Sequence, residues 1–412
     1  MYVFQARMRS GESRVHSWLT IERLVLYSGV MLVLYVIFLA SWAWTSHGFT
    51  IADASRPGVD FSIFWSASYV MLHGSPWQVY DYSLFQKIEL AHFEFPNGSF
   101  MPWLYPPTFL LLVTPLALLP PIVGYMLFIG VSTLLFVIGA LRLSGLTSSF
   151  NQSRMSWLLV AACPCIFVAA VFGQNSILTG AVAAFALLWI DRKPVRAGLC
   201  IGLLAIKPQM ALLFPFVLIA AGAWRALGAA AISATLFGTL SALTCGAQCL
   251  RPFLLITRVT RELILEQGGH YWLASPTTFA VLRAGGVPVA LAYIGGTCVA
   301  LIAIAAACHV WKTTRDIRLR SAILVVAALI ANPYVWLYEL AWLGIALACV
   351  TSLGLTKGWL RGEQEILVLA WLLPIYEFFN RVVMLPQIGP VVLLLLLLII
   401  LRRVRAAAEM TP

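Results

Sequence analysis

Long apolar stretches separated by short polar segments dominate the chain. The first, at 24–44, has about the 20 residues that a helix needs to cross a bilayer. It follows a basic leader but lacks the small-residue cleavage site of a signal peptide, so we predict a retained helix. The other apolar stretches lie at 105–119, 122–141, 156–172, 175–190, 197–206, 208–224, 226–249, 288–311, 321–331, 335–355, 366–383 and 387–401. This pattern predicts an all-α, polytopic membrane protein with a single transmembrane domain over residues 1–412.

The composition supports this fold class and excludes several others. Hydrophobic residues make up 61% of the chain and charged residues 10%, whereas soluble domains average about 45–50% and 25%. An ordinary soluble enzyme, a disordered chain and a collagen-like fibre are therefore excluded. Most of the eight cysteines lie within apolar stretches, and none has the spacing of a zinc site. We predict no bound metal and no cofactor.

Basic residues are distributed unevenly among the segments that connect the apolar stretches. If both termini lie on one side together with 142–154, 191–196, Arg225, 312–320 and 357–365, that side holds 19 of the 27 lysines and arginines. The positive-inside rule then places this side in the cytoplasm. It also accounts for the net charge of +11 without a nucleic-acid partner.

With both termini inside, the number of crossings must be even, whereas the chain has 13 apolar stretches. We therefore predict about 12 transmembrane helices. The proline-flanked stretch 105–119 is our candidate for a segment that is interfacial or re-entrant, although the sequence leaves open whether it spans the membrane.

Three polar breaks interrupt the apolar sequence, at 173–175, 207–209 and 332–334. Because unsatisfied backbone groups cannot face lipid, such breaks must line a protected or water-filled cavity. The predicted topology places all three on the outer face, beside a first loop at 45–104 and a second loop at 250–287. We therefore expect a substrate cavity that opens outward.

The first loop contains the most informative segment of the chain. Residues 61–72 are apolar and rich in aromatic side chains, which predicts an amphipathic helix at the membrane surface. Asp60 directly precedes it, where a carboxylate can cap the helix. A carboxylate screened from water also has a raised pKa, which suits a general base. The two interpretations of Asp60 are compatible.

Several short motifs follow one another over about 60–345. They are Asp60-x-x-x-Phe64-Trp65-x-Ala67, His73-Gly74-x-Pro76, Val79-Tyr80, Tyr105-Pro106-Pro107, Gly173-Gln174-Asn175, Ala197-Gly198 with Ala205-Ile206-Lys207-Pro208, Asn332-Pro333-Tyr334 and Tyr338-Glu339-Leu340. In this order they resemble glycosyltransferase family 87, the polyprenol-phosphate-mannose-dependent mannosyltransferases of bacterial envelopes.

The resemblance implies a GT-C architecture with a catalytic aspartate in the first loop, and the family's aspartate matches Asp60. It implies an inverting transfer of a hexose, most often mannose, from a polyprenyl phosphate. The acceptor would be an envelope glycolipid or glycan at the outer face of a bacterial inner membrane. Some members of the family carry a histidine motif near residues 332–339, and this sequence departs from that motif, which leaves the donor sugar and the acceptor open.

Residues for the remaining roles follow from charge and position. Lys207 is the first candidate to bind the donor phosphate, because an ionisable residue within apolar sequence is a functional hypothesis by default. Arg258 and Arg261 in the second loop are further candidates. Predicted substrate-binding residues, on outward segments or at the breaks, are Trp65, Tyr105, Gln174, Asn175, Asn332, Tyr338 and Glu339.

Two other functions compete with a transferase. A transporter or lipid-linked sugar flippase also uses broken helices to build a binding site, but the chain lacks two-half symmetry and its breaks gather at one face. A lipid-glycan polymerase or ligase would need a large late outer loop, which is absent after residue 287. We therefore favour the transferase.

Overall fold

The computed structural model describes residues 17–49, 56–95, 101–149 and 155–409, and within these ranges it contains helices and no strand. The prediction of an all-α membrane protein is confirmed. The long helices are α1 (Ile21–Thr45), α5 (Pro121–Ser144), α9 (Ser176–Trp189), α13 (Trp224–Cys245), α16 (Val289–Thr313), α17 (Ile317–Ala331), α18 (Leu343–Lys357), α19 (Glu363–Val383) and α20 (Gly389–Glu409).

The other helices, most of them shorter, fill the bundle between these and form its two loops. They are α2 (Val59–His73), η1 (Pro76–Tyr80), α3 (Tyr82–His92), α4 (Pro107–Val113), η3 (Leu116–Leu118), α6 (Leu146–Ser149), α7 (Met155–Ala161), α8 (Pro164–Phe172), α10 (Pro194–Leu203), η4 (Leu204–Ile206), α11 (Pro208–Ala211), α12 (Leu213–Ala220), η5 (Ala247–Cys249), α14 (Leu250–Thr260), η6 (Arg261–Glu266), η7 (Gly269–Ala274), α15 (Thr278–Ala284) and η8 (Leu337–Trp342).

Six helical segments in the described ranges are long and apolar enough to cross a membrane, and α7 with α8 makes a seventh if this pair, bent by 52°, is one span. The six are Ile21–Thr45, Pro121–Ser144, Trp224–Cys245, Val289–Thr313, Leu337–Lys357 and Glu363–Val383. Four further apolar helices are shorter than a straight crossing requires. The count of about 12 crossings therefore remains a prediction.

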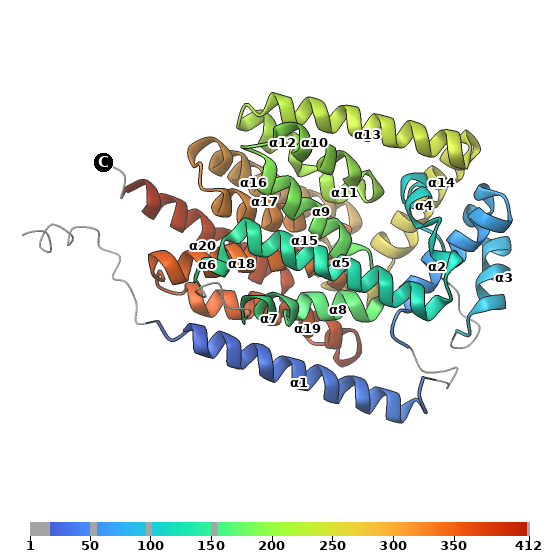
Figure 1. Cartoon of the computed structure of the whole chain (residues 1–412), viewed down its shortest axis with the longest axis horizontal. Helices are drawn as coiled ribbons and strands as arrows, with labels where there is room; N and C mark the ends of the chain where they lie inside the picture. Colours follow the sequence, from blue (N-terminus) through green and yellow to red (C-terminus); the bar gives the residue numbers. More distant parts are fainter. Residues whose placement is uncertain (1–16, 50–55, 96–100, 150–154, 410–412) are drawn as a thin grey trace, which may run out of the picture.

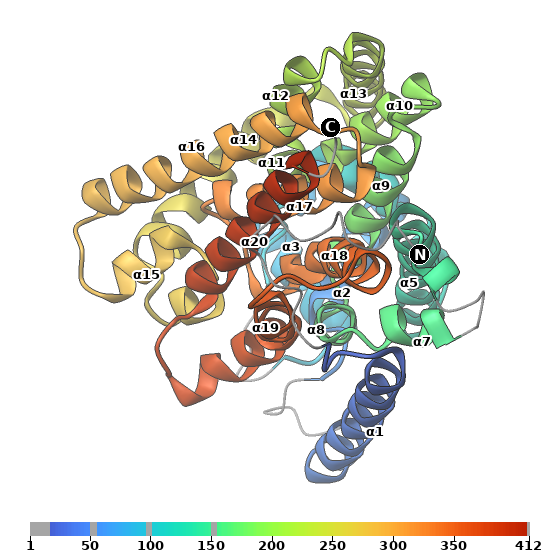
Figure 2. The ribbon, with the colours of Figure 1, turned by 90° about the vertical axis from the view of Figure 1, so that its left-hand side faces the viewer.

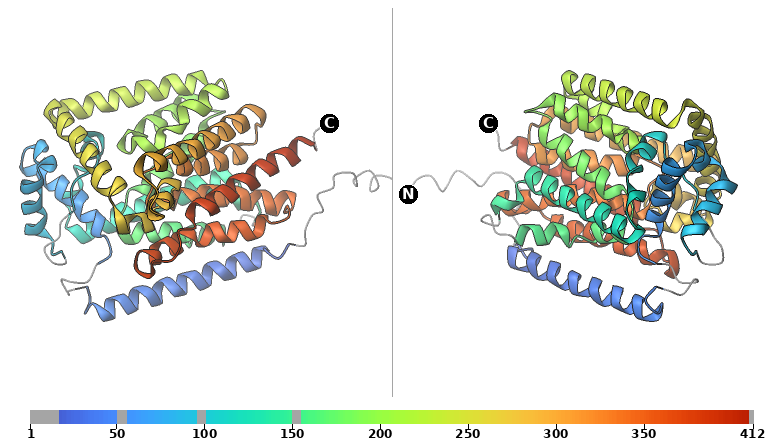
Figure 3. Two further views of the ribbon diagram at one scale, coloured as in Figure 1. Left: turned by 180° about the vertical axis from the view of Figure 1, so that it is seen from behind. Right: turned by 45° about the vertical axis from the view of Figure 1, so that its right-hand side comes forward.

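The helices form a bundle around α18, whose residues from Leu343 to Gly354 are all buried. Figure 2 shows α18 in the middle and α1 at the edge. Helix α1 keeps much of its apolar surface exposed, as a lipid-facing helix does. Helix α13 lies on the side opposite to α1 (Figures 1 and 3) and packs against α10. A methyl group at Gly198 of α10 would lie 2.5 Å from the Ala226 carbonyl oxygen, so this pair needs glycine.

Helices α2, α3, α4 and α14 gather at one end of the bundle, whereas α1 begins and α20 ends at the other (Figure 1). We call the first of these the loop end. The first and second loops thus lie at the same end, in agreement with the arrangement predicted from charge.

Helix α2 corrects one prediction. It forms where the sequence indicates, but every residue from Asp60 to Ser68 is buried, so it has no polar face and is not an amphipathic surface helix. Its aromatic rings pack against α4 and α5 instead; Phe64, for example, lies edge-on to Phe109 with ring centroids 4.9 Å apart. The aromatic content that indicated a membrane surface thus belongs to a protein core.

The stretch 105–119 contains only α4, of seven residues, and η3. Seven helical residues span about 10 Å, a third of the hydrocarbon core. Phe109, Leu110 and Val113 are fully buried, and α4 packs on α2 and α13. This arrangement favours a short helix held inside the protein over a separate crossing.

Candidate functional site

The three polar breaks end helices in the way that their sequences require. Helix α8 ends at Gly173, whose φ of +77° favours glycine, and a methyl group there would lie 2.7 Å from Cβ of Phe61. This close approach holds α2 against the break. Pro208 follows the end of η4, and Asn332-Pro333 follows the end of α17, because proline cannot continue a helix.

Asp60 is the second residue of α2, not its N-cap. The cap position is Gly58, which has no side chain, so the interpretation of Asp60 as an N-cap is wrong. Its Oδ2 instead accepts a 2.6 Å hydrogen bond from Nε2 of Gln174. The hydroxyl of Tyr105 donates to Oε1 of Gln174 at 3.0 Å, which fixes the orientation of the amide. Gln174 and Tyr105 together hold the carboxylate in place.

The surroundings of Asp60 favour its protonated form more than water does. Burial is the main cause, and it raises the pKa of Asp60 to about 6; the negative charge of Glu339 acts in the same direction. The hydrogen bond from Gln174 and the positive charges of Lys207 and Arg381 oppose the rise. A carboxyl group with this pKa is largely ionised at pH 7 yet binds a proton more readily than an exposed aspartate.

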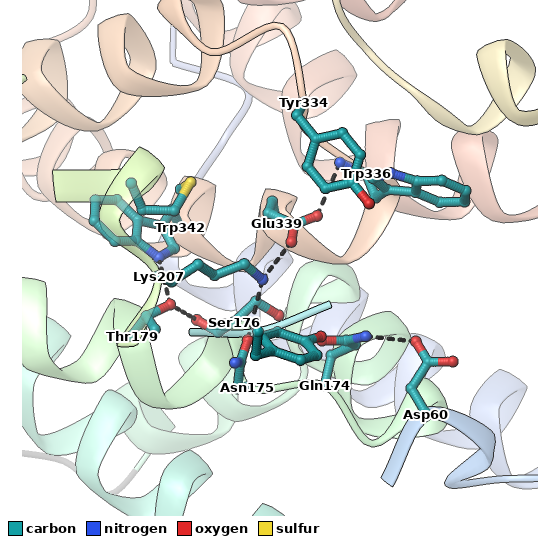
Figure 4. A network of polar contacts seen from close by, with 12 residues as sticks. Asp60, Gln174, Asn175, Ser176, Thr179, Lys207, Tyr334, Trp336, Glu339 and Trp342 are labelled. Carbon is teal, nitrogen blue, oxygen red and sulfur yellow. Dashed lines mark hydrogen bonds and ion pairs between the residues drawn. The ribbon is translucent and has the colours of Figure 1, made fainter. Parts of the chain in front are cut away.

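Lys207 is as buried as Asp60, and its side chain reaches Glu339 and Asn175 (Figure 4). Its Nζ forms an ion pair with Glu339 and donates a 3.0 Å hydrogen bond to Oδ1 of Asn175. Each side chain of the ion pair is only 4% exposed. The backbone N–H of Trp336 donates to the other oxygen of Glu339 at 2.8 Å. Asn175 and Lys207, from the first two breaks, thus meet Glu339, which follows the third break and lies 132 residues after Lys207.

A cavity of about 590 Å³ opens beside Asp60. Its walls come from the second half of α1, the start of α2, the end of α8 and the last turns of α19. The lining residues are Phe38, Ser41, Trp42, Thr45, Arg56, Val59, Asp60, Phe95, Met101, Val171, Phe172, Phe378 and Arg381. The cavity therefore brings one carboxylate, two guanidinium groups and an aromatic wall together.

The remaining predicted substrate ligands have structural partners. Trp65 donates from Nε1 to the Leu119 carbonyl at 2.9 Å and packs within the first loop. Oδ1 of Asn332 accepts the Tyr334 N–H at 2.9 Å, which closes the turn after α17. The ring of Tyr338 lies 5.6 Å from Nζ of Lys207. Tyr338 is thus the one of these three next to the charged cluster.

The two arginines predicted in the second loop lie elsewhere. Arg258 is exposed on α14, which has no buried residue, and Arg261 pairs with Glu262 at 3.6 Å and with Glu266 at 3.3 Å. Neither lines the cavity beside Asp60.

The sequence matches glycosyltransferase family 87 over residues 103–337. This match covers more than half of the chain. The protein belongs to glycosyltransferase family 87. It is therefore a membrane glycosyltransferase, with a sugar donor and an acceptor as substrates, which confirms the resemblance seen in its motifs. No curated protein and no solved structure matches the chain.

The family match includes Tyr105 and the break residues from Gln174 to Asn332 but not Asp60 or Glu339. In this family 87 protein, tertiary contacts bring Asp60 to the matched segment, above all the hydrogen bond that Gln174 donates to its carboxylate. The functional assignment of Asp60 remains a prediction that these contacts support.

Sequence reasoning missed Arg56 and Arg381. The spacing of four residues between Glu377 and Arg381 predicts an ion pair along α19. This prediction is wrong, because Glu377 accepts a hydrogen bond from Nε2 of Gln387 at 2.7 Å instead. A signal was present, because Arg381 is one of only eight basic residues on the predicted outer face, and it lies within the apolar stretch 366–383. Arg56 carried no comparable signal.

Proposed function

We propose that the protein transfers a hexose, with mannose the family's usual sugar, from a polyprenyl phosphate to an envelope glycolipid or glycan acceptor. The transfer would take place at the outer face of a bacterial inner membrane. The observation that carries the proposal is the carboxylate of Asp60, which is buried, held by Gln174 and open to a cavity with a lipid-facing helix as one wall. The family match favours this function over a transporter.

Asp60 would act as the general base. Its Oδ2 accepts the Gln174 amide, so Oδ1 takes the proton of the acceptor hydroxyl. The acceptor oxygen then forms a bond to the anomeric carbon while the bond from that carbon to the phosphate oxygen breaks. The electron pair of the broken bond leaves with the polyprenyl phosphate. Attack opposite to the leaving phosphate inverts the configuration at the anomeric carbon.

The Lys207–Glu339 pair would support the cavity from behind. The two buried opposite charges neutralise each other and have further hydrogen bonds to Asn175 and to the Trp336 N–H, so they need no ligand as a counter-ion. Their role in the proposal is to hold the three breaks together and to set the charge near Asp60. Asn175 and Tyr338 remain candidates for contact with the sugar.

A comparison of two sugar donors tests this proposal. Membranes from cells that express the protein, and vector-only membranes as the control, would be given radiolabelled mannose either on a polyprenyl phosphate or on a nucleotide diphosphate. We expect label to enter lipid or glycan from the polyprenyl donor only. Protein-dependent transfer from the nucleotide donor alone, under conditions that prevent formation of the lipid donor, would overturn the proposal.

A further inference from the structure

Arg381 presents a guanidinium group to the cavity beside Asp60. Its central carbon lies 4.9 Å from the ring centroid of Phe172 and 4.8 Å from that of Phe378. Its Nε donates to the Phe378 carbonyl at 3.1 Å. Those contacts fix the plane of the group, while its two terminal nitrogens form no hydrogen bond within the described part of the chain. The guanidinium group of Arg381 is therefore held in one orientation, and its terminal N–H groups remain available to a ligand.

Arg56 reaches the same cavity from the turn before α2. Its guanidinium carbon lies 5.4 Å from the centroid of Phe93, and its Nη2 is buried without a hydrogen-bond partner among the described residues. A buried donor without an acceptor is costly, particularly on a charged group. An anion in the cavity would supply the missing acceptor.

The balance of charge also favours an anion at this position. Neither arginine forms an ion pair with a carboxylate in the described ranges, whereas the charge of Lys207 is neutralised by Glu339. Among the described residues, the charged ones that line the cavity are Asp60, Arg56 and Arg381, and these three together carry one net positive charge when Asp60 is ionised. The donors that Arg56 and Arg381 present to the cavity, above all the buried Nη2 of Arg56, therefore suit an anionic ligand.

From this juxtaposition we propose that Arg56 and Arg381 bind the phosphate of the lipid-linked sugar donor, in place of Lys207, Arg258 and Arg261. This inference rests on the proposed function. Two planar guanidinium groups suit a phosphate because each can donate two parallel hydrogen bonds to its oxygens. When the bond between the sugar and the phosphate breaks, the phosphate gains negative charge, and the two arginines stabilise it where it develops.

The wall that α1 contributes to the cavity favours a phosphate that is part of a lipid. Phe38 and Trp42 of α1 line the cavity, and the other faces of α1 are largely exposed apolar surface. An isoprenoid chain can leave the cavity along this helix toward the bilayer, whereas a free phosphate would gain nothing from the aromatic wall.

Binding of tritiated polyprenyl phosphate to the purified full-length protein tests this site. We expect Arg381→Gln and Arg56→Gln each to weaken binding by about tenfold or more, the loss expected when a hydrogen bond to a charged group is removed. Arg381→Lys keeps the charge but not the fork and should recover part of the affinity. Arg258→Gln, which removes an exposed arginine outside the cavity, is the matched control and should bind as the wild type does.

Thermal unfolding of each variant would show that it is folded. Competition by inorganic phosphate at concentrations similar to those of polyprenyl phosphate would overturn the assignment to a lipid. Wild-type affinity in both folded arginine variants, with sugar transfer intact, would overturn the site and leave the proposed function standing. Arginine-dependent binding in a protein that transfers no sugar from the lipid donor would support the site and count against the proposed function.

Discussion

Replacing Asp60 with asparagine should make the protein more stable while removing its activity. The side chain is 4% exposed, and burial raises its pKa from 3.8 to about 6. Each pKa unit corresponds to about 1.4 kcal/mol, so ionising Asp60 costs the folded state on the order of 3 kcal/mol relative to the unfolded chain. Asparagine has a similar shape, can still accept the bond from Gln174, and does not carry this cost.

The difference in stability between the wild type and Asp60→Asn should depend on pH. A carboxyl group whose pKa is raised by folding binds its proton more tightly in the folded state. The wild type therefore loses stability as the pH rises from about 4 to about 6, and the full cost is present above pH 6. Asp60→Asn should match the wild type in thermal unfolding near pH 4 and exceed it by a few degrees at pH 8.

Unfolding would be followed in detergent at a fixed scan rate, with Asp81→Asn as the matched control. Asp81 is in the same loop and caps α3 by accepting the N–H groups of Ser83 and Leu84 at 3.0 Å. Asparagine caps a helix nearly as well, so this variant should follow the wild type at pH 8. If Asp60→Asn were less stable than the wild type at pH 8, the ionised carboxylate would be a structural anchor and the reasoning would be refuted.

Three further outcomes are expected. The wild-type transfer rate should fall below about pH 6 as Asp60 takes up one proton. Gln174→Ala should shift this fall to higher pH, because the hydrogen bond from Gln174 lowers the pKa of Asp60; a rate that does not change between pH 5 and 7 would contradict this. Lys207→Met and Glu339→Gln should each lower the free energy of unfolding by about 3–5 kcal/mol. In a double-mutant cycle, the two changes together should lower it by less than the sum of the single effects. Gly173→Ala should reduce the yield of folded protein, since its methyl group would clash with α2; wild-type yield and activity would argue against the tight packing described.

Much of the fold could be predicted from the sequence because lipid restricts the choices. An apolar stretch must be helical, and a polar break must be shielded, so the convergence of Gln174, Asn175 and Lys207 followed from the breaks alone. The burial of α2 did not follow, because an aromatic helix has the same composition at a membrane surface and in a protein core.

The partners of the charged side chains were harder to predict than the positions of those side chains in the fold. Lys207 was identified as a charge in apolar sequence, but its neutralisation by Glu339 depends on a contact across 132 residues that no local pattern encodes. Arg381 had a plausible local partner in Glu377, and only the packing of Gln387 onto that carboxylate leaves the arginine facing the cavity. Charge pairing in a membrane bundle is thus decided by tertiary contacts.

Transfer of radiolabelled mannose from polyprenyl-phosphate-mannose, compared between the wild type and Asp60→Asn in membranes with equal amounts of each protein, tests the central claim most directly. Removing a positioned general base should lower the rate on the order of 10²- to 10⁴-fold, while Asp81→Asn transfers at the wild-type rate. Equal transfer by the wild type and Asp60→Asn would show that Asp60 is not the base and that the proposed mechanism is wrong.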